Sequence, residues 1–205
     1  MNCFEEYANQ LNGLRKGEET KIDVHFIVSE PLKSFCFEVN NKIEKQTAGF
    51  ISMGVESIVV PHISLCMGFV DSYEMLEQVF TAVSLYADNI APFDFDSIGM
   101  YFKGVSPVAN QYLFIDPLQN EFLAHQKEEL GRRLKNVIHP MHWNVTEEKA
   151  HITVGCYKDV AQSARKVVDA YNTIPPCKIS QIGVSSAGKY GVCLSLLKVF
   201  DLQWR

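Results

Sequence analysis

The sequence predicts an α+β fold in which one chain of 205 residues forms two similar halves. The first reason is the order of local patterns: strand, helix, strand, helix and strand segments follow one another twice, with little sequence identity between the copies. The second reason is a pair of matched tetrapeptides, His62-Ile63-Ser64-Leu65 and His151-Ile152-Thr153-Val154, one in each half. No stretch rich in Pro, Gly or Ser separates the halves, so we expect a single domain over residues 1–205 with lobes near 21–110 and 111–205.

The first half follows a polar segment, for which we expect a short helix or a loose arm. Its expected elements are strands at 23–29, 57–70 and 93–103, and helices that begin at Pro31 and after Asp71. Residues 23–29 alternate and are rich in Val, Phe and Ile, which is typical of a strand. Pro31 suits the first turn of a helix, because its ring fixes a helical φ. Asp71 has Glu74 three residues later, which is the spacing of a capping box at the start of a helix.

The second half repeats this order. Its expected elements are a strand at 111–116, a helix after Asn120, the second tetrapeptide strand, a helix at 159–171, and a hairpin formed by 177–186 and 190–201. Apolar residues recur at helical spacing after Asn120, which predicts a helix with one buried face. Pro175 and Pro176 end the segment after the last helix, and the turn signal Ala187-Gly188-Lys189 joins the two strands of the hairpin.

The two tetrapeptides share the pattern His, apolar, hydroxyl, apolar, and both lie in strand-like stretches. Successive side chains of a strand point to opposite faces, so His62 shares a face with Ser64, and His151 shares one with Thr153. Imidazole titrates near neutral pH and hydroxyls donate to phosphate oxygens. Two such strands side by side would therefore suit acid–base chemistry on a phosphate ester. A histidine in an apolar strand also occurs as an inert core residue, and that alternative stays open.

The paired tetrapeptides, their near-symmetric placement and the chain length resemble the 2H phosphoesterase superfamily, which includes bacterial 2′,5′ RNA ligase-like proteins and cyclic nucleotide phosphodiesterases. The first copy carries Ser64 where many members have threonine. The resemblance implies two pseudo-symmetric lobes, each a mainly antiparallel sheet with helices packed outside. Each lobe would contribute one of the two motif strands to a central cleft between them.

The resemblance also implies a metal-independent phosphodiesterase that hydrolyses a 2′,3′-cyclic phosphate or a 2′,5′ linkage of a nucleotide or RNA end, and that in reverse acts as an RNA ligase. His62 and His151 are the expected catalytic residues, and Ser64 and Thr153 the expected phosphate-binding residues. No cofactor and no metal are expected. A different class stays open: a nucleotide-binding module that holds an AMP-like molecule without turnover.

Two further features of the second half have weaker signals. Trp143 and Tyr157 are the aromatic candidates for stacking on a base. Either one could instead pack in the core, and Tyr157 would reach the cleft only if its strand bends. His139 and His142 lie three residues apart in a loop, but no nearby pair of cysteines completes a zinc site.

The six cysteines include no CxxC pair, and we expect them to be reduced. Cys66 shares a strand face with His62 by parity. Four residues along a strand span about 13 Å, however, which is too far for a nucleophilic Cys–His pair.

The bulk composition, with 47% apolar and 21% charged residues, is that of a globular protein. A net charge of −5 without a broad basic excess argues against binding a long duplex and favours a small nucleotide or an RNA terminus as partner. No apolar run is long enough to span a bilayer, and the N-terminus lacks the pattern of a secretory signal. We therefore expect no membrane partner, a cytoplasmic location and a monomer.

Overall fold

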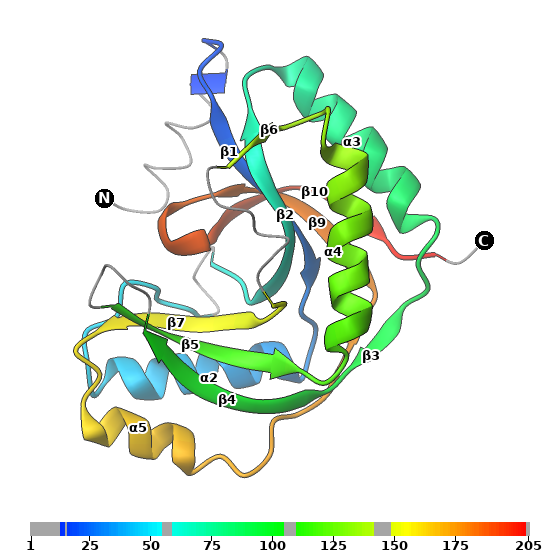
Figure 1. Cartoon of the computed structure of the whole chain (residues 1–205). Coiled ribbons are helices and arrows are strands. Elements are labelled where there is room, and N and C mark those ends of the chain that lie inside the picture. Colours follow the sequence, from blue (N-terminus) through cyan, green and yellow to red (C-terminus); the bar gives the residue numbers. More distant parts are fainter. Residues whose placement is uncertain (1–12, 15, 55–58, 105–109, 142–148, 204–205) are drawn as a thin grey trace.

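The computed structural model describes residues 13–14, 16–54, 59–104, 110–141 and 149–203, and Figure 1 shows their arrangement. The strands are β1 (Thr20–Ile27), β2 (His62–Val70), β3 (Phe93–Phe95), β4 (Ser97–Gly104), β5 (Asn110–Pro117), β6 (His139–Pro140), β7 (Ile152–Lys158), β8 (Cys177–Ile179), β9 (Gln181–Ala187) and β10 (Cys193–Asp201). The helices are α2 (Leu32–Glu44), α3 (Tyr73–Ala87), α4 (Asn120–Leu134), α5 (Gln162–Asp169) and the 3-10 helix η2 (Lys189–Gly191).

Eight of these strands form one antiparallel sheet. Its order is β10-β9-β1-β2-β7-β5-β4, and β6 pairs with the far end of β2. Between β2 and β7 a single residue pair, Ile63 with Ile152, is in register. We call the part with β10, β9, β1, β2 and β6 lobe A, and the part with β7, β5 and β4 lobe B.

The helices cover the two lobes separately, as Figure 1 shows. Helix α3 contacts β2, β9 and β10, and α4 contacts β2, so both belong to lobe A. Helix α2 contacts β7, and α5 contacts β4, so these two cover lobe B. The expected α+β architecture of two mainly antiparallel half-sheets with helices packed against them is therefore confirmed.

A small apolar cluster connects the lobes away from the Ile63–Ile152 pair. Its buried members are Phe37, Ile51, Met53, Val59, Cys156, Val192 and Leu194, with Tyr112 and Tyr190 packed against them. Cys156 belongs to lobe B, whereas Val192 and Leu194 come from the turn and the start of β10 in lobe A. Burial of these side chains holds the half-sheets together where their strands no longer pair.

The two lobes are not successive halves of the chain. The C-terminal strands β9 and β10 pair beside β1 in lobe A, and β4 from the expected first half pairs with β5 in lobe B. The expected lobe limits of 21–110 and 111–205 therefore do not describe the molecule. Local patterns show where strands lie, but pairing between distant strands decides which of them share a sheet.

Some element boundaries also differ from the expected ones. The segment 93–103 forms two strands, because β3 pairs with β8 in a separate two-stranded sheet while β4 pairs with β5. Helix α3 is capped by Ser72, whose Oγ accepts a hydrogen bond from the backbone N of Met75, rather than by Asp71. Asp71 instead lies 3.2 Å from the Nε2 atom of His139. Within the described residues, no helix combines the length and the apolar character required to cross a membrane.

Candidate active site

The Ile63–Ile152 pair brings the two tetrapeptides together at the junction of the lobes. Both isoleucine side chains are fully buried. Because side chains alternate along each strand, the residues that flank this pair project from the opposite face of the sheet. These residues are His62 and Ser64 on β2, and His151 and Thr153 on β7. The structure therefore places all four predicted site residues around one junction.

The two histidines are held in the same way. The Nδ1 atom of His62 lies 2.9 Å from the carbonyl oxygen of Val60. The Nδ1 atom of His151 lies at the same distance, 2.9 Å, from the carbonyl oxygen of Lys149. A carbonyl oxygen only accepts hydrogen bonds, so Nδ1 is the donor in both rings. Each ring is thereby fixed with Nε2 as the atom that is left to exchange a proton.

A buried carboxylate in lobe A, Asp23 on β1, accompanies the first tetrapeptide. Its Oδ2 atom accepts a 2.7 Å hydrogen bond from the hydroxyl of Ser64. The same oxygen lies 3.3 Å from the Nε2 atom of His62. Asp23 is fully buried, and its other oxygen, Oδ1, has no hydrogen-bond partner within the described part of the chain. The sequence analysis did not single out Asp23, although a carboxylate between the apolar residues Ile22 and Val24 was a visible signal.

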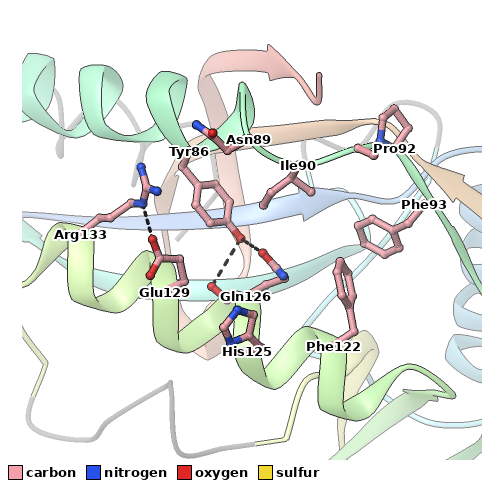
Figure 2. Close-up of a pocket in the computed structure, with 11 residues that line it drawn as sticks. Tyr86, Asn89, Ile90, Pro92, Phe93, Phe122, His125, Gln126, Glu129 and Arg133 are labelled. Atoms are coloured by element: carbon pink, nitrogen blue, oxygen red, sulfur yellow. Dashed lines mark hydrogen bonds and ion pairs between the residues drawn. The ribbon is translucent and has the colours of Figure 1, made fainter. Parts of the chain in front are cut away.

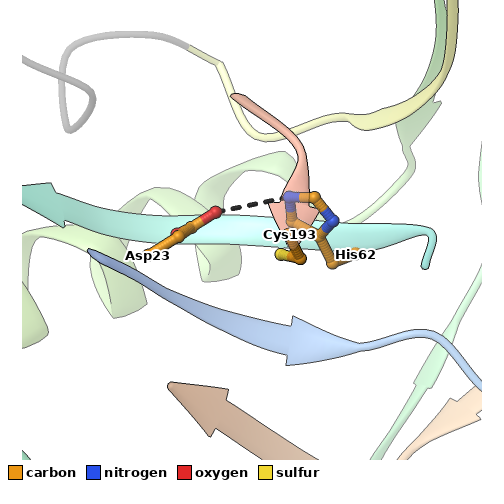
Figure 3. A group of neighbouring side chains, drawn as sticks. All are labelled: Asp23, His62 and Cys193. Carbon is orange, nitrogen blue, oxygen red and sulfur yellow. Dashed lines mark ion pairs between the residues drawn. The ribbon is translucent and has the colours of Figure 1, made fainter. Parts of the chain in front are cut away.

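A cysteine and a third histidine complete this side of the site. Cys193, the first residue of β10, has its sulfur 3.6 Å from Nδ1 and 3.8 Å from Nε2 of His25. The rings of His25 and His62 lie 4.9 Å apart between centroids. Figure 3 shows Asp23, His62 and Cys193 converging from three different strands. The cysteine that contacts the motif histidine is thus Cys193 and not Cys66, the one considered from the sequence.

The charges of this cluster reinforce one another. Burial by itself lowers the pKa of His62, but the neighbouring Cys193 and Asp23 outweigh it and the pKa is raised well above its usual value. Burial by itself raises the pKa of the Cys193 thiol. The nearby rings of His25 and His62 have a larger, opposite effect, so the pKa is lowered to about 6. For Cys66, by contrast, burial raises the pKa to about 12, so this residue remains a thiol.

On the lobe B side the site is aromatic. The ring of His151 lies 3.9 Å from the ring of Phe114, and Tyr112 stacks on Phe114 with centroids 5.6 Å apart. Phe114 is also the β5 partner of Thr153 on β7. A row of rings therefore leads away from the second motif histidine along β5. Sequence reasoning missed this row, because only strand pairing places β5 beside β7.

The aromatic residues predicted for base stacking are not part of this row. Tyr157 is fully buried, and the side-chain amide of Asn40 donates a hydrogen bond to its hydroxyl. Its ring packs against Phe102 at 6.1 Å. The prediction that Tyr157 stacks on a base is therefore wrong, because neither face of its ring reaches solvent. Trp143 and His142 lie outside the described residues.

A separate cavity of about 470 Å³ lies between α3, α4 and β3 (Figure 2). The hydroxyl of Tyr86 donates to the side chain of Gln126 at its wall, and Arg133 pairs with Glu129. None of the four motif residues lines this cavity. It therefore lies apart from the acid–base groups.

No family model matches the sequence, and no curated protein matches it either. Solved structures do match in fold. TT0787 of Thermus thermophilus is 15% identical, has a TM-score of 0.64, and is aligned over 90% of this chain and 99% of its own. LigT of E. coli complexed with 3′-AMP is 14% identical, with a TM-score of 0.58 over 90% of this chain and 99% of its own.

A eukaryotic structure has the same fold. Usb1 of Kluyveromyces marxianus is 10% identical, with a TM-score of 0.51 over 90% of this chain and 98% of its own. At such low identities the likeness concerns the fold, and it extends over nearly the whole chain. The chain therefore shares its fold with TT0787, LigT and Usb1, in agreement with the fold that the paired tetrapeptides led us to expect.

Proposed function

We propose that the chain is a metal-independent phosphodiesterase that acts on a small nucleotide or an RNA end, with a 2′,3′-cyclic phosphate or a 2′,5′ linkage as the reacting group. The observation that carries this proposal is the meeting of the two tetrapeptides at the Ile63–Ile152 pair, with both rings fixed through Nδ1. The crystal structures of LigT with 3′-AMP and with ATP support a small nucleotide as the substrate class.

The surroundings of the two histidines favour different roles. Both nitrogens of His62 face acceptors, the carbonyl oxygen of Val60 and the carboxylate of Asp23. Only the doubly protonated ring satisfies both, so His62 is assigned as the general acid. His151 lies in a partly exposed position with Nδ1 as donor, and its Nε2 takes the role of general base.

The proposed hydrolysis of a 2′,3′-cyclic phosphate uses one water molecule. His151 takes a proton from the water as its oxygen bonds to phosphorus. His62 gives a proton to the ribose oxygen as the bond between that oxygen and phosphorus breaks. The product is a phosphate monoester beside a free hydroxyl. Ligation would use a ribose 5′-hydroxyl in place of water: its oxygen bonds to phosphorus as it gives its proton to His151, and the 3′ oxygen leaves with a proton from His62, which forms a 2′,5′ linkage.

The hydroxyls of Ser64 and Thr153 are proposed to donate to the non-bridging oxygens, where negative charge increases in the transition state. Ser64 donates to Asp23 in the present structure, so its hydroxyl would change acceptor when phosphate binds. The aromatic row of Phe114 and Tyr112 extends from His151, and we assign the nucleobase to Tyr112 at its partly exposed end.

One observation favours the alternative of a nucleotide-binding module without turnover. The carboxylate of Asp23 already occupies the two donors, Ser64 and the Nε2 atom of His62, that an incoming phosphate would need. A nucleotide held beside this carboxylate without reaction would give tight binding of AMP in calorimetry and no turnover of any substrate below.

The test is turnover by wild type, His62→Ala and His151→Ala on a panel of 2′,3′-cyclic nucleotides and of 2′,5′- and 3′,5′-linked dinucleotides. Each substitution should lower kcat by about 10²- to 10⁴-fold, the usual contribution of general acid–base catalysis. His125→Ala changes an exposed histidine of α4 and is the matched control, which should retain wild-type turnover. Activity should persist in a strong chelator. Full activity in either motif variant would remove that histidine from the mechanism.

A further inference from the structure

Three side chains that are far apart in the sequence bring an oxygen, a nitrogen and a sulfur atom together in lobe A. Asp23 on β1, His62 on β2 and Cys193 on β10 each offer one such atom, and the three atoms lie within 4.8 Å of one another. Figure 3 shows the side chains converging. All three residues are buried. Within the described residues, this is the group of His, Cys, Asp and Glu side chains whose spacing suits a metal ion.

The donor set matches the preferences of zinc. Zn²⁺ binds thiolate sulfur at about 2.3 Å, imidazole nitrogen at about 2.0–2.1 Å and carboxylate oxygen at about 2.0–2.2 Å. Nitrogen and oxygen ligands of one tetrahedral ion are then roughly 3.3 Å apart. The Nε2 atom of His62 and the Oδ2 atom of Asp23 are 3.3 Å apart. The carboxylate and a thiolate together supply two negative charges, which balance the charge of the ion.

A second observation at the same place also favours a bound cation. The Oδ1 atom of Asp23 is buried and has no hydrogen-bond partner within the described residues. Ser185, the β9 partner of Asp23 in the sheet register, also has a buried hydroxyl oxygen without a partner there. An unsatisfied buried carboxylate oxygen costs free energy. A cation bound to the carboxylate would lower that cost, because its positive charge attracts both carboxylate oxygens.

We infer that Asp23, His62 and Cys193 form a zinc site, with the fourth position of the ion left to water. His25 would act from outside this set, because its ring contacts the sulfur of Cys193 and fixes the side chain. Zinc occupies the Nε2 atom of His62, which cannot hold a proton and a metal at once. The role of the site rests on the proposed function, in which His62 is the general acid. Because bound zinc blocks the Nε2 atom of this histidine, zinc inhibits turnover and the metal-free protein is the active form.

Binding is tested with Co²⁺ as a spectroscopic probe on the whole chain of 205 residues. Wild type should take up one equivalent and show the intense absorption of charge transfer from thiolate to cobalt. Cys193→Ala should lose this band, and its affinity for Zn²⁺ should fall by at least about 100-fold, more than the 10- to 100-fold typical of residues outside the ligand set. Cys66→Ala removes another buried cysteine of the same lobe and should keep both properties.

Asp23→Asn is the second variant, because it keeps the shape of the side chain. It should retain the band and bind zinc at least about 10-fold more weakly. Circular dichroism without metal shows whether each variant is folded. Wild type without the band, or an equal band in Cys193→Ala, would overturn the zinc site.

Inhibition is measured separately, as the ratio of turnover with and without Zn²⁺ for each protein. Wild type and Cys66→Ala should be inhibited by zinc and restored by a chelator, and Cys193→Ala should be less sensitive. Cobalt binding without any turnover of metal-free protein would contradict the proposed function and leave the metal site intact. Turnover that zinc does not affect, despite cobalt binding, would contradict the inhibitory role.

Discussion

His62 and His151 have equivalent backbone contacts but different surroundings. Both rings donate through Nδ1 to a carbonyl oxygen two residues earlier in the chain. His62 is then enclosed by Asp23 and Cys193, whereas His151 lies against the ring of Phe114. The repeated tetrapeptide thus fixes the orientation of each ring, and the neighbouring strands give each ring its own electrostatic environment.

At the scale of single residues, the hydroxyl of Thr153 should contribute to catalysis and little to folding. Thr153→Ala should lower kcat by about 10²- to 10³-fold, because a donor aimed at transition-state charge is lost. Thr153→Ser keeps the hydroxyl and should retain most of the activity. Steady-state kinetics on a 2′,3′-cyclic nucleotide measures both variants, and similar losses in the two would show that the methyl group, rather than the hydroxyl, matters.

Tyr112 should affect substrate binding more than the chemical step. Tyr112→Ala removes a ring that stacks on Phe114, and base–aromatic stacking contributes about 1–3 kcal/mol per base. We expect KM to rise by about 5- to 150-fold with kcat nearly unchanged. Tyr112→Phe keeps the ring and serves as the control. A fall in kcat with constant KM in Tyr112→Ala would contradict stacking at this position.

At the scale of elements, one buried side chain fixes the second motif strand. The amide of Asn40 on α2 donates to the carbonyl oxygens of Ile51 and Val154, and its oxygen accepts from the backbone N of Met53. Asn40 thereby connects α2, the segment at 51–53 and β7. Since Val154 belongs to the second tetrapeptide, this network holds the strand that presents His151.

Replacing Asn40 should therefore destabilise the protein. Asn40→Ala leaves several buried polar groups without partners, at a cost of about 1–3 kcal/mol or more in the free energy of unfolding. Urea denaturation followed by circular dichroism measures this change. Asn41→Ala alters the next residue of the same helix, which is exposed, and should have a far smaller effect. Equal stability of the two variants would mean that the network adds nothing to folding.

At the scale of the whole molecule, the two lobes are interleaved in sequence. Lobe A contains strands from both ends of the chain, and lobe B contains strands from its middle. The Ile63–Ile152 pair and the apolar cluster that includes Cys156 and Leu194 connect them. Neither lobe is a continuous segment that could be separated from the other.

Both lobes should consequently unfold together. Scanning calorimetry should give one transition whose calorimetric and van't Hoff enthalpies agree, as expected of a single cooperative unit. A nucleotide monophosphate bound at the junction should raise the transition temperature. At a ligand concentration of 100 times Kd, binding adds about 2.7 kcal/mol to the free energy of unfolding. Two resolved transitions would contradict the single domain that the sequence predicts.

The sequence by itself determined the α+β class, the approximate positions of the strands and helices, and the two tetrapeptides whose residues meet. Those features depend on the spacing of neighbouring residues, which a single chain displays directly. The proposed zinc ligands could not be predicted in this way. No local pattern connects Asp23 and Cys193 with His62, and only the packing of β1, β2 and β10 brings the three side chains together. Only the tertiary structure decided the make-up of the lobes, the burial of Tyr157 and the aromatic row on β5, because long-range strand pairing selects neighbours that no local pattern specifies.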